Sequence, residues 1–296
     1  DTIPPTLTIT EPTEDAFVSG AELTVIGTTS DPHLENVRVQ GQTATLAGDT
    51  FRRDQVALTP GANTILVEAR DAAGNTTRAE RHVILDSEPP VIRFLESNLE
   101  VQEGARFSRA VAITVDVQDA TATTTEIQLD GAPYVSGALI SSEGTHTLAA
   151  TATDAAGSRS SRSLTFEIDL SAPVFESVTP ADGAVISTSE VTITGRVRGA
   201  TSVTVDGAPA TLSGDATVAD FTSASIALAE GSRTFELAAS DAAGNRATRT
   251  LTVIRDTTAP TISIALPAAN AVLGTTTIEV SGTVSDPRVE SVKVNG

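Results

Sequence analysis

Aspartate is the residue type whose spacing in this sequence suggests chemistry, because it recurs at two kinds of position in three domain-sized units. One kind opens a D-A-A-G-N or D-A-A-G-S turn, and the other stands just before a proline-containing linker. Calcium binds about six to eight oxygen atoms, several of them from carboxylates, so linker and turn aspartates gathered at a junction would form a calcium site. The candidate ligands are the linker residues Asp86, Asp169 and Asp256 and the turn residues Asp71, Asp154 and Asp241.

A purely structural role is the alternative for these aspartates. Asp and Asn are ordinary turn residues, since their side-chain oxygens accept hydrogen bonds from nearby main-chain N–H groups. The sequence contains no D-x-D-x-D-G loop and no clustered acidic run, so no calcium-loop motif supports the first interpretation. Both interpretations stay open, and calcium is the one cofactor that the sequence suggests.

Catalytic groups are sparse. His33, His82 and His146 fall at different positions of the repeated pattern, so they cannot build one shared metal site, and we expect each to be exposed to solvent. The sequence has no G-x-S-x-G or H-E-x-x-H motif and no Cys, and no group breaks the repeat symmetry as a catalytic site would. It also has no Trp and a single Tyr, Tyr134, which leaves no aromatic platform for stacking sugar rings. We therefore expect a protein without catalytic activity.

The elements that must position the aspartates follow a domain-sized repeat. Linker prolines at positions 5, 90, 173 and 260 are 85, 83 and 87 residues apart, and a turn glycine stands 10 residues before each turn aspartate. From turn aspartate to the next linker proline the distance is always 19 residues, so length varies only in the first two-thirds of a unit, where surface loops absorb insertions. The structural glycines are Gly61, Gly144 and Gly231 before the final hairpin and Gly74, Gly157 and Gly244 within its turn.

Alternation of apolar and polar residues predicts strands on both sides of each hairpin turn. Ile65, Val67 and Ala69 alternate with polar neighbours in the first unit, and the other two units repeat the pattern. Short β-branched segments upstream bring the count to about seven strands in a unit, the number of an Ig-type sandwich. The predicted fold is all-β: tandem Ig-like β-sandwich domains arranged as an extended array.

The predicted domains are four. Residues 1–86, 87–169 and 170–256 form complete repeats, and residues 257–296 form an incomplete fourth repeat that holds only N-terminal strands. Residues 282–296 match residues 27–41 at nine of fifteen positions, but the sequence stops before a fourth turn glycine and hairpin. Because a sandwich without its last strands has an open edge, we expect the native chain, or another chain, to complete this repeat.

The charge balance narrows the range of partners. Nineteen Lys and Arg residues against 38 Asp and Glu residues give a net charge of −19, which repels nucleic acid and anionic lipid. No stretch is apolar for the 18 or more residues that a membrane span needs. We expect no nucleic-acid partner and no membrane insertion in this segment.

The segments DTTAP, GTVSDP, V-x-V-N-G and L-x-x-G-x-N-T-I-x-V-x-A-x-D-A-A-G-N resemble the bacterial Ig-like tandem repeats of large secreted and surface proteins, including adhesin-type stalks. The resemblance implies a non-catalytic stalk or spacer at the bacterial cell surface or outside the cell, with an adhesin as the first expectation. The alternatives are a repeating subunit of an extracellular filament and spacer or accessory domains of a secreted polysaccharide-active enzyme. Implied partners are the neighbouring Ig-like repeats of the same longer chain and a host or cell-surface ligand bound elsewhere in it.

Overall fold

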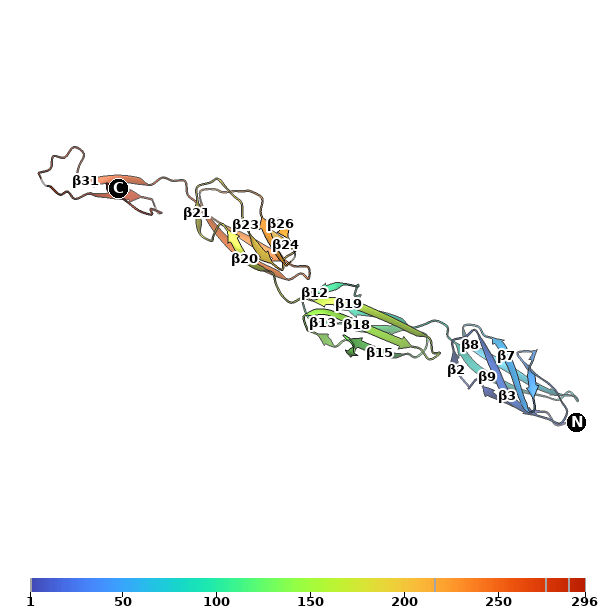
Figure 1. Ribbon diagram of the computed structural model, residues 1–296. Helices are drawn as coiled ribbons and strands as arrows, with labels where there is room; N and C mark the ends of the chain where they lie inside the picture. Colours follow the sequence, from blue (N-terminus) through green and yellow to red (C-terminus); the bar gives the residue numbers. More distant parts are fainter. Residues whose placement is uncertain (1, 216, 275, 287, 296) are drawn as a thin grey trace. The chain divides into compact units, whose positions relative to one another are not determined.

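The computed structural model describes residues 2–215, 217–274, 276–286 and 288–295, and within them it shows strands and loops without a helix (Figure 1). Those residues therefore contain no helix long and apolar enough to cross a membrane. The chain divides into two compact units, Asp1–Leu170 and Ser171–Gly296. The prediction of an all-β chain of tandem sandwiches is confirmed. We keep the name repeat 1 to repeat 4 for residues 1–86, 87–169, 170–256 and 257–296, whose boundaries stay a prediction.

Repeat 1 is a sandwich of two sheets. One sheet has the strand order β1-β3-β7-β6, and the other has the order β2-β9-β8-β4-β5, in which only β2 and β9 are parallel. Its strands are β1 (Thr6–Glu11), β2 (Ala16–Val18), β3 (Glu22–Ser30), β4 (Leu34–Val39), β5 (Gln42–Thr43), β6 (Thr45–Ala47), β7 (Thr50–Ala57), β8 (Gly61–Asp71) and β9 (Thr76–Leu85).

Repeat 2 keeps the five-stranded sheet, with the order β12-β19-β18-β15-β16, but its other face is built from the smaller sheets β11-β10-β14 and β13-β17. Its strands are β10 (Val91–Glu96), β11 (Leu99–Glu100), β12 (Ala105–Phe107), β13 (Val111–Ala112), β14 (Thr114–Gln118), β15 (Thr124–Leu129), β16 (Ala132–Pro133), β17 (Leu139–Ile140), β18 (Gly144–Thr153) and β19 (Arg159–Ile168).

Repeat 3 returns to the plan of repeat 1, with sheets of order β20-β23-β27-β26 and β21-β30-β29-β24-β25 and an added pair β22-β28. Its strands are β20 (Val174–Thr179), β21 (Ala184–Ile186), β22 (Glu190–Val191), β23 (Thr194–Arg198), β24 (Ser202–Val205), β25 (Ala208–Pro209), β26 (Thr211–Gly214), β27 (Val218–Thr222), β28 (Ile226–Ala227), β29 (Gly231–Ser240) and β30 (Arg246–Arg255). Repeat 4 contributes the pair β31 (Thr261–Leu266) and β32 (Ser281–Ser285).

Each of the first three repeats has a hydrophobic core of its own between its sheets. In repeat 1, Val25 and Phe51 from the first sheet meet Ile65 and Val67 from the second, and all four are fully buried. Burial of these alternate residues explains the period of two in the sequence, because successive side chains of a strand point to opposite faces. Repeats 2 and 3 have equivalent cores around Phe166 and Phe235.

In repeats 1 and 2 the chain enters the sandwich at one end of the final hairpin and leaves at the other. The carbonyl oxygen of Pro5, just before β1, accepts a hydrogen bond from Oγ1 of Thr77 at the start of β9. Leu85, the last residue of β9, pairs with Gly61 at the opposite end of the same hairpin. Repeat 2 shares this arrangement, since Ser160 bonds the Pro90 carbonyl oxygen and Ile168 pairs with Gly144. A strand of this length spans about 30 Å, so the chain crosses each of these two repeats from end to end.

Candidate cation site at the first repeat junction

The hairpin turns of repeats 1 and 3 hold their aspartates in the same way. Asp71 Oδ1 accepts the main-chain N–H of Asn75 at 2.8 Å, and Asp71 Oδ2 accepts the side-chain amide of Asn75 at 2.7 Å. Asp241 and Asn245 repeat both bonds, at 2.8 and 2.9 Å. The amide of Asn75 lowers the pKa of Asp71, against the opposing effect of burial. In these two repeats both side-chain oxygens of the turn aspartate therefore accept hydrogen bonds within the turn.

The hairpin of repeat 2 differs because Ser158 stands where the other two have Asn. Asp154 Oδ1 still accepts the main-chain N–H of Ser158, at 2.7 Å. Serine has no amide to reach the second oxygen, and Asp154 Oδ2 has no hydrogen-bond partner among the described residues. The residue is only 6% exposed, so one oxygen of a buried carboxylate is left without a donor.

The linker aspartate Asp86 is the second buried carboxylate of this junction. Its main-chain N–H donates to the carbonyl oxygen of Val18 at 2.9 Å, which attaches it to β2 of repeat 1. Its Oδ1 accepts a long bond of 3.3 Å from the main-chain N–H of Glu88. Its Oδ2 is buried and has no hydrogen-bond partner in the described part of the chain, and the whole residue is 7% exposed.

Asp119 joins these two aspartates. One carboxylate oxygen from each of Asp86, Asp119 and Asp154 lies within 4.8 Å of the other two. Asp119 follows β14 and is half-buried, and its Oδ1 accepts both the main-chain N–H and the hydroxyl of Thr121 at 2.8 Å. All three side chains belong to the first compact unit, and together they form a carboxylate cluster of hard oxygen donors that we call the junction cluster.

The structure thus brings together two of the six predicted aspartates, Asp86 and Asp154, and adds one that sequence reasoning missed. Asp119 directly follows the strand that pairs with the first strand of its repeat, the position that Asp31 and Asp286 occupy in repeats 1 and 4. It was missed because repeat 2 has Q-D-A there instead of S-D-P. A strand-by-strand alignment of repeats 1, 2 and 4 would have placed Asp119 at the position of Asp31 and Asp286.

The remaining predicted linker aspartates have other surroundings. Asp256 Oδ2 forms an ion pair with Arg288 Nη1 at 3.2 Å, within the second unit. Asp169 donates its main-chain N–H to the carbonyl oxygen of Phe107. The six predicted turn glycines all have a positive φ, which glycine adopts without the strain that other residues meet: 88° for Gly61, 127° for Gly144, 100° for Gly231, 93° for Gly74, 89° for Gly157 and 94° for Gly244.

The expectation that all three histidines are exposed is wrong for His146. It is 6% exposed, its ring packs 5.5 Å from that of Phe166, and its Nδ1 lies 2.7 Å from Asp130 Oδ2. Burial lowers the pKa of His146, but its bonds to Asp130 and to the Ser142 carbonyl oxygen outweigh that effect and raise the pKa above its ordinary value. The strand alternation decides this burial, because His146 is two residues before the core residue Leu148 on the same face of β18.

A second acidic group, Glu14, Asp15 and His82, is exposed and has a simpler explanation. Glu14 Oε1 lies 2.6 Å from His82 Nδ1, and Glu14 Oε2 lies 3.0 Å from Arg81 Nη1. The hydrogen bond to Glu14 raises the pKa of His82, and the same bond lowers the pKa of Glu14. The group is a network of hydrogen bonds and ion pairs at the surface.

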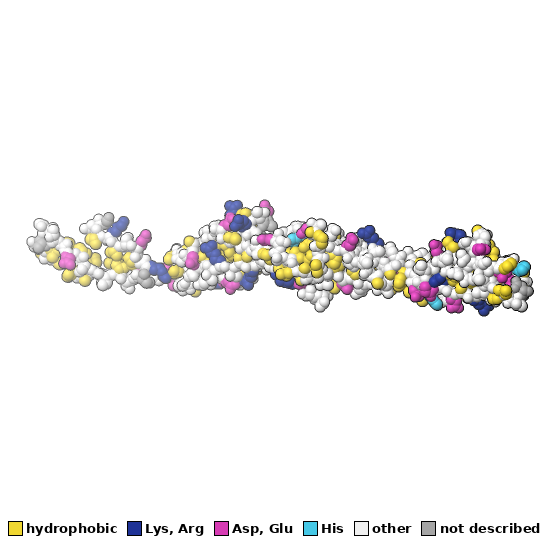
Figure 2. Space-filling model, turned by 90° about the horizontal axis from the view of Figure 1, so that it is seen from below, with side chains coloured by type: hydrophobic (Ala, Val, Ile, Leu, Met, Phe, Trp, Pro, Cys, Tyr) yellow, Lys and Arg dark blue, Asp and Glu magenta, His cyan; other side chains and the backbone are white. Residues whose placement is uncertain are grey.

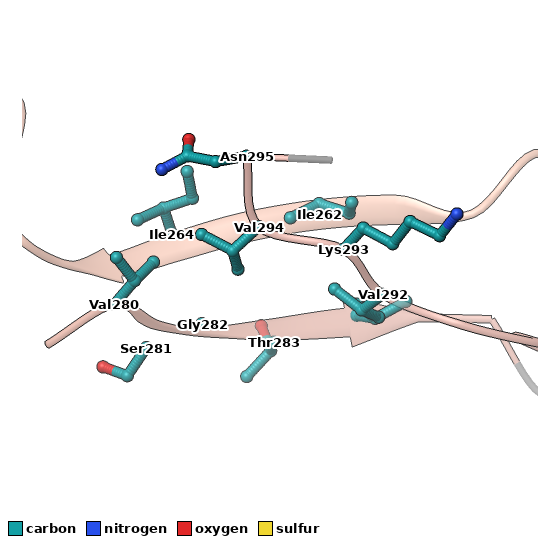
Figure 3. Close-up of a pocket in the computed structure, with 11 residues that line it drawn as sticks. Ile262, Ile264, Val280, Ser281, Gly282, Thr283, Val292, Lys293, Val294 and Asn295 are labelled. Atoms are coloured by element: carbon teal, nitrogen blue, oxygen red, sulfur yellow. The ribbon is translucent and has the colours of Figure 1, made fainter.

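Repeat 4 contains an apolar pocket of about 530 Å³ between β31, β32 and residues 292–295 (Figure 3). Its lining corresponds to a sandwich interior: Ile264 is 65% exposed, while Ile9, at the same position of repeat 1, is 6% exposed. The sequence given ends at Gly296, before any equivalent of β7, β8 and β9.

The charged side chains on the face shown in Figure 2 are interspersed, with acidic and basic groups side by side. The ion pairs of the chain include Arg78 with Glu68, at 2.7 Å, and Arg109 with Glu96, at 2.8 Å. Exposed pairs of this kind contribute little to stability.

Two-sheet sandwiches with a final β-hairpin and a mainly apolar core define the class of Ig-like domains. Residues 5–87 and 173–257, which are more than half of the chain, match the family described as glucodextranase, domain B. The chain belongs to this family. The matched residues cover repeats 1 and 3, whose sheet orders agree; repeat 2, with its divided second sheet, lies between them.

Individual relatives are similar over part of their length. Bacillopeptidase F of Bacillus subtilis (strain 168) is 32% identical over 116 residues, which are 38% of this chain and 8% of that protein. Among solved structures, a D1–D4 ectodomain fragment of ICAM-5 is 13% identical, with 90% of this chain and 80% of that one covered and a TM-score of 0.43. A 1.5-MDa bacterial ice-binding adhesin is 15% identical, with 86% and 100% covered and a TM-score of 0.32. These two TM-scores are too low to support an inference.

Proposed function

We propose that this chain is a non-catalytic spacer of Ig-like domains in a bacterial extracellular or cell-surface protein. The observation that carries the proposal is the path of the chain through repeats 1 and 2, where it enters beside the turn of the final hairpin and leaves at the opposite end of that hairpin. A module crossed end to end adds its full length to the distance between whatever precedes and follows it. Several modules of this kind in a row therefore hold the preceding and following parts of the protein far apart.

The surface chemistry supports the same role. The net charge of −19 keeps a chain with many exposed loops soluble and disfavours association with anionic surfaces. The core of each repeat is built from its own residues, so stability should be close to a sum over repeats and junctions. Neighbouring repeats of the same chain are then its first partners, and a ligand on a host or cell surface would bind elsewhere in the protein.

A specific observation favours a secreted enzyme as the protein that carries this spacer. The matched family is named for a domain of glucodextranase, and the relative with 32% identity is named as a peptidase. Both names are those of enzymes. The first supports the alternative of spacer or accessory domains of a secreted polysaccharide-active enzyme, and the second extends that alternative to a peptidase. An adhesin stalk and a filament subunit would use the same modules, and the neighbouring domains of the full-length protein distinguish the three.

Small-angle X-ray scattering of the 296-residue chain tests the spacer. Repeats of about 30 Å each, joined end to end, predict a maximum dimension above roughly 100 Å. A compact globule of this length would have a radius of gyration of about 19 Å and a maximum dimension of roughly 60 Å. The compact value would overturn the proposal, since folded-back repeats provide no reach. Circular dichroism of the same sample must show β structure, so that a long unfolded chain is not mistaken for a stalk.

A further inference from the structure

The junction cluster takes its carboxylates from both sides of the boundary between repeats 1 and 2. Asp86 directly follows β9 and is tied to β2 through its main-chain bond to Val18, whereas Asp119 and Asp154 belong to loops of repeat 2. Asp86 and Asp154 are both more than nine-tenths buried. Their Oδ2 atoms are buried carboxylate oxygens without a hydrogen-bond partner among the described residues.

This arrangement is unfavourable for three carboxylates alone. A buried charge needs a hydrogen-bonded or opposite partner, and like charges within a few ångströms repel each other. A bound cation would remove both problems at once, because it would offset the repulsion and coordinate the two unpartnered oxygens. Three aspartates provide hard oxygen donors without a sulfur or imidazole ligand, and that donor set suits calcium better than zinc.

We propose that the junction cluster binds one calcium ion, held by Asp86, Asp119 and Asp154, and that this ion fixes repeat 2 to repeat 1. A cavity of about 590 Å³ beside the cluster, lined by Asp86, Glu88 and Thr121 among others, gives the ion a path from solvent. Main-chain carbonyl oxygens and water would complete the coordination, as in other protein calcium sites.

Two sequence differences make this site specific to the first junction. In repeats 1 and 3 the side-chain amides of Asn75 and Asn245 already bond the second oxygen of the turn aspartate, whereas Ser158 leaves that oxygen of Asp154 available. Repeat 3 also has Gly199 at the position of Asp119, as the pairing of Arg198 with Val174 and of Gln118 with Val91 shows.

At the junction between repeats 3 and 4, the side chain of Arg288 supplies a positive charge next to the linker aspartate, as we propose that calcium does at the first junction. Arg288 stands two residues after Asp286, at the position that Thr121 has relative to Asp119. Its Nη1 lies 3.2 Å from Oδ2 of the linker aspartate Asp256, and its main-chain N–H donates to Asp286 Oδ1 at 2.7 Å. A positive group therefore contacts the linker carboxylate there, and Thr121 cannot supply one at the first junction.

Isothermal titration of the chelator-treated 296-residue chain with calcium chloride is the direct test. We expect binding with a dissociation constant on the order of 0.1–1 mM or tighter, the range of extracellular calcium modules. Asp119→Asn keeps the bond to the Thr121 N–H but removes a ligand charge, and it should weaken binding at least about tenfold. Glu126→Gln removes the same charge from an exposed strand position and should leave binding unchanged. The weakest expected dissociation constant is about 1 mM. A folded wild-type chain that binds no calcium at a calcium concentration roughly ten times that value would overturn the proposal.

Two further variants test the site without removing an aspartate. Ser158→Asn restores the amide that repeats 1 and 3 use and should weaken calcium binding by occupying Asp154 Oδ2. Thr121→Arg copies the Arg288 arrangement and should make the melting temperature insensitive to chelator. Calcium binding of wild-type strength in Asp119→Asn, Ser158→Asn and Thr121→Arg alike would place the ion elsewhere and reject this site. The spacer proposal would survive that result, because it depends on the path of the chain alone.

Discussion

The ring of Phe51 lies directly over Gly27, with no room for a β-carbon between the two. A β-carbon built on Gly27 would overlap the Phe51 ring and the main-chain oxygen of Thr8. Repeat 3 has the same pair, since a β-carbon on Gly195 would lie 2.6 Å from Cε1 of Phe221. Both glycines lie in one of the two inner strands of a four-stranded sheet. The aromatic core residue of these repeats therefore needs a residue without a side chain at the facing position.

Gly27→Ala should destabilise repeat 1 by about 1–3 kcal/mol, the usual cost of overpacking a core. The added methyl group has main chain on one side and a fully buried ring on the other, and neither can move without disturbing the core. Urea unfolding followed by circular dichroism measures the effect. Thr8→Ala, on the exposed face of the neighbouring strand, is the control and should change stability by less than about 0.5 kcal/mol. Equal midpoints for the two variants would show that the ring can move aside.

Asn75→Ser should lower the melting temperature of repeat 1 by a few degrees, because it turns the D-A-A-G-N hairpin into the D-A-A-G-S hairpin of repeat 2. The variant keeps the main-chain bond to Asp71 Oδ1 but loses the side-chain bond to Asp71 Oδ2. Differential scanning calorimetry in the presence of chelator measures the change. The exposed neighbour Thr76→Ser serves as control, and an unchanged melting temperature in Asn75→Ser would show that the amide bond contributes nothing.

The stability of repeat 2 should fall as the pH rises from about 6 to 8. The folded-state pKa of His146 is raised, chiefly because its bonds to Asp130 and Ser142 outweigh the effect of burial. A histidine whose pKa is higher in the folded state than in the unfolded state stabilises the folded state. This contribution is complete at a pH below the unfolded-state pKa of about 6.5, and it is lost as the pH rises past the folded-state pKa. Urea midpoints at several pH values measure the slope.

Asp130→Asn is the matched variant for this pH dependence. An asparagine at this position retains an oxygen for the Thr147 N–H bond and tolerates the φ of 52°, but it provides no charge for His146. The slope between pH 6 and 8 should become flatter. An identical slope in the variant would exclude the pair as its origin.

Tyr134→Phe should cost repeat 2 about 1 kcal/mol, the net value of one hydrogen bond. The Tyr134 hydroxyl lies 2.6 Å from the carbonyl oxygen of Ala138 and 3.1 Å from that of Ile113, and the ring packs against the core of the repeat. Phenylalanine keeps the ring and loses the donor, so chemical unfolding should isolate the hydrogen bond. Val135→Ala, at a residue that is 76% exposed, should be neutral by comparison. A neutral Tyr134→Phe would mean that water replaces the bond.

The sequence alone determined the sandwich class and the final hairpins, because both depend on short-range patterns. The alternation around Ile65 and Leu148 sets which face of a strand is buried, and the D-A-A-G turn needs a glycine with positive φ three residues after its aspartate. These constraints act between residues that are close along the chain, so periodicity and turn chemistry report them directly.

Only the tertiary structure decided which aspartates meet and which histidine is buried. Asp86, Asp119 and Asp154 are dozens of residues apart, and their convergence depends on how repeat 2 attaches to the end of β9. The sequence contained the six recurring aspartates but could not distinguish a carboxylate satisfied by Asn75 from one left open by Ser158. Hydrogen-bond satisfaction and proximity are three-dimensional properties, and they separate the structural aspartates of this chain from the proposed ligands of an ion.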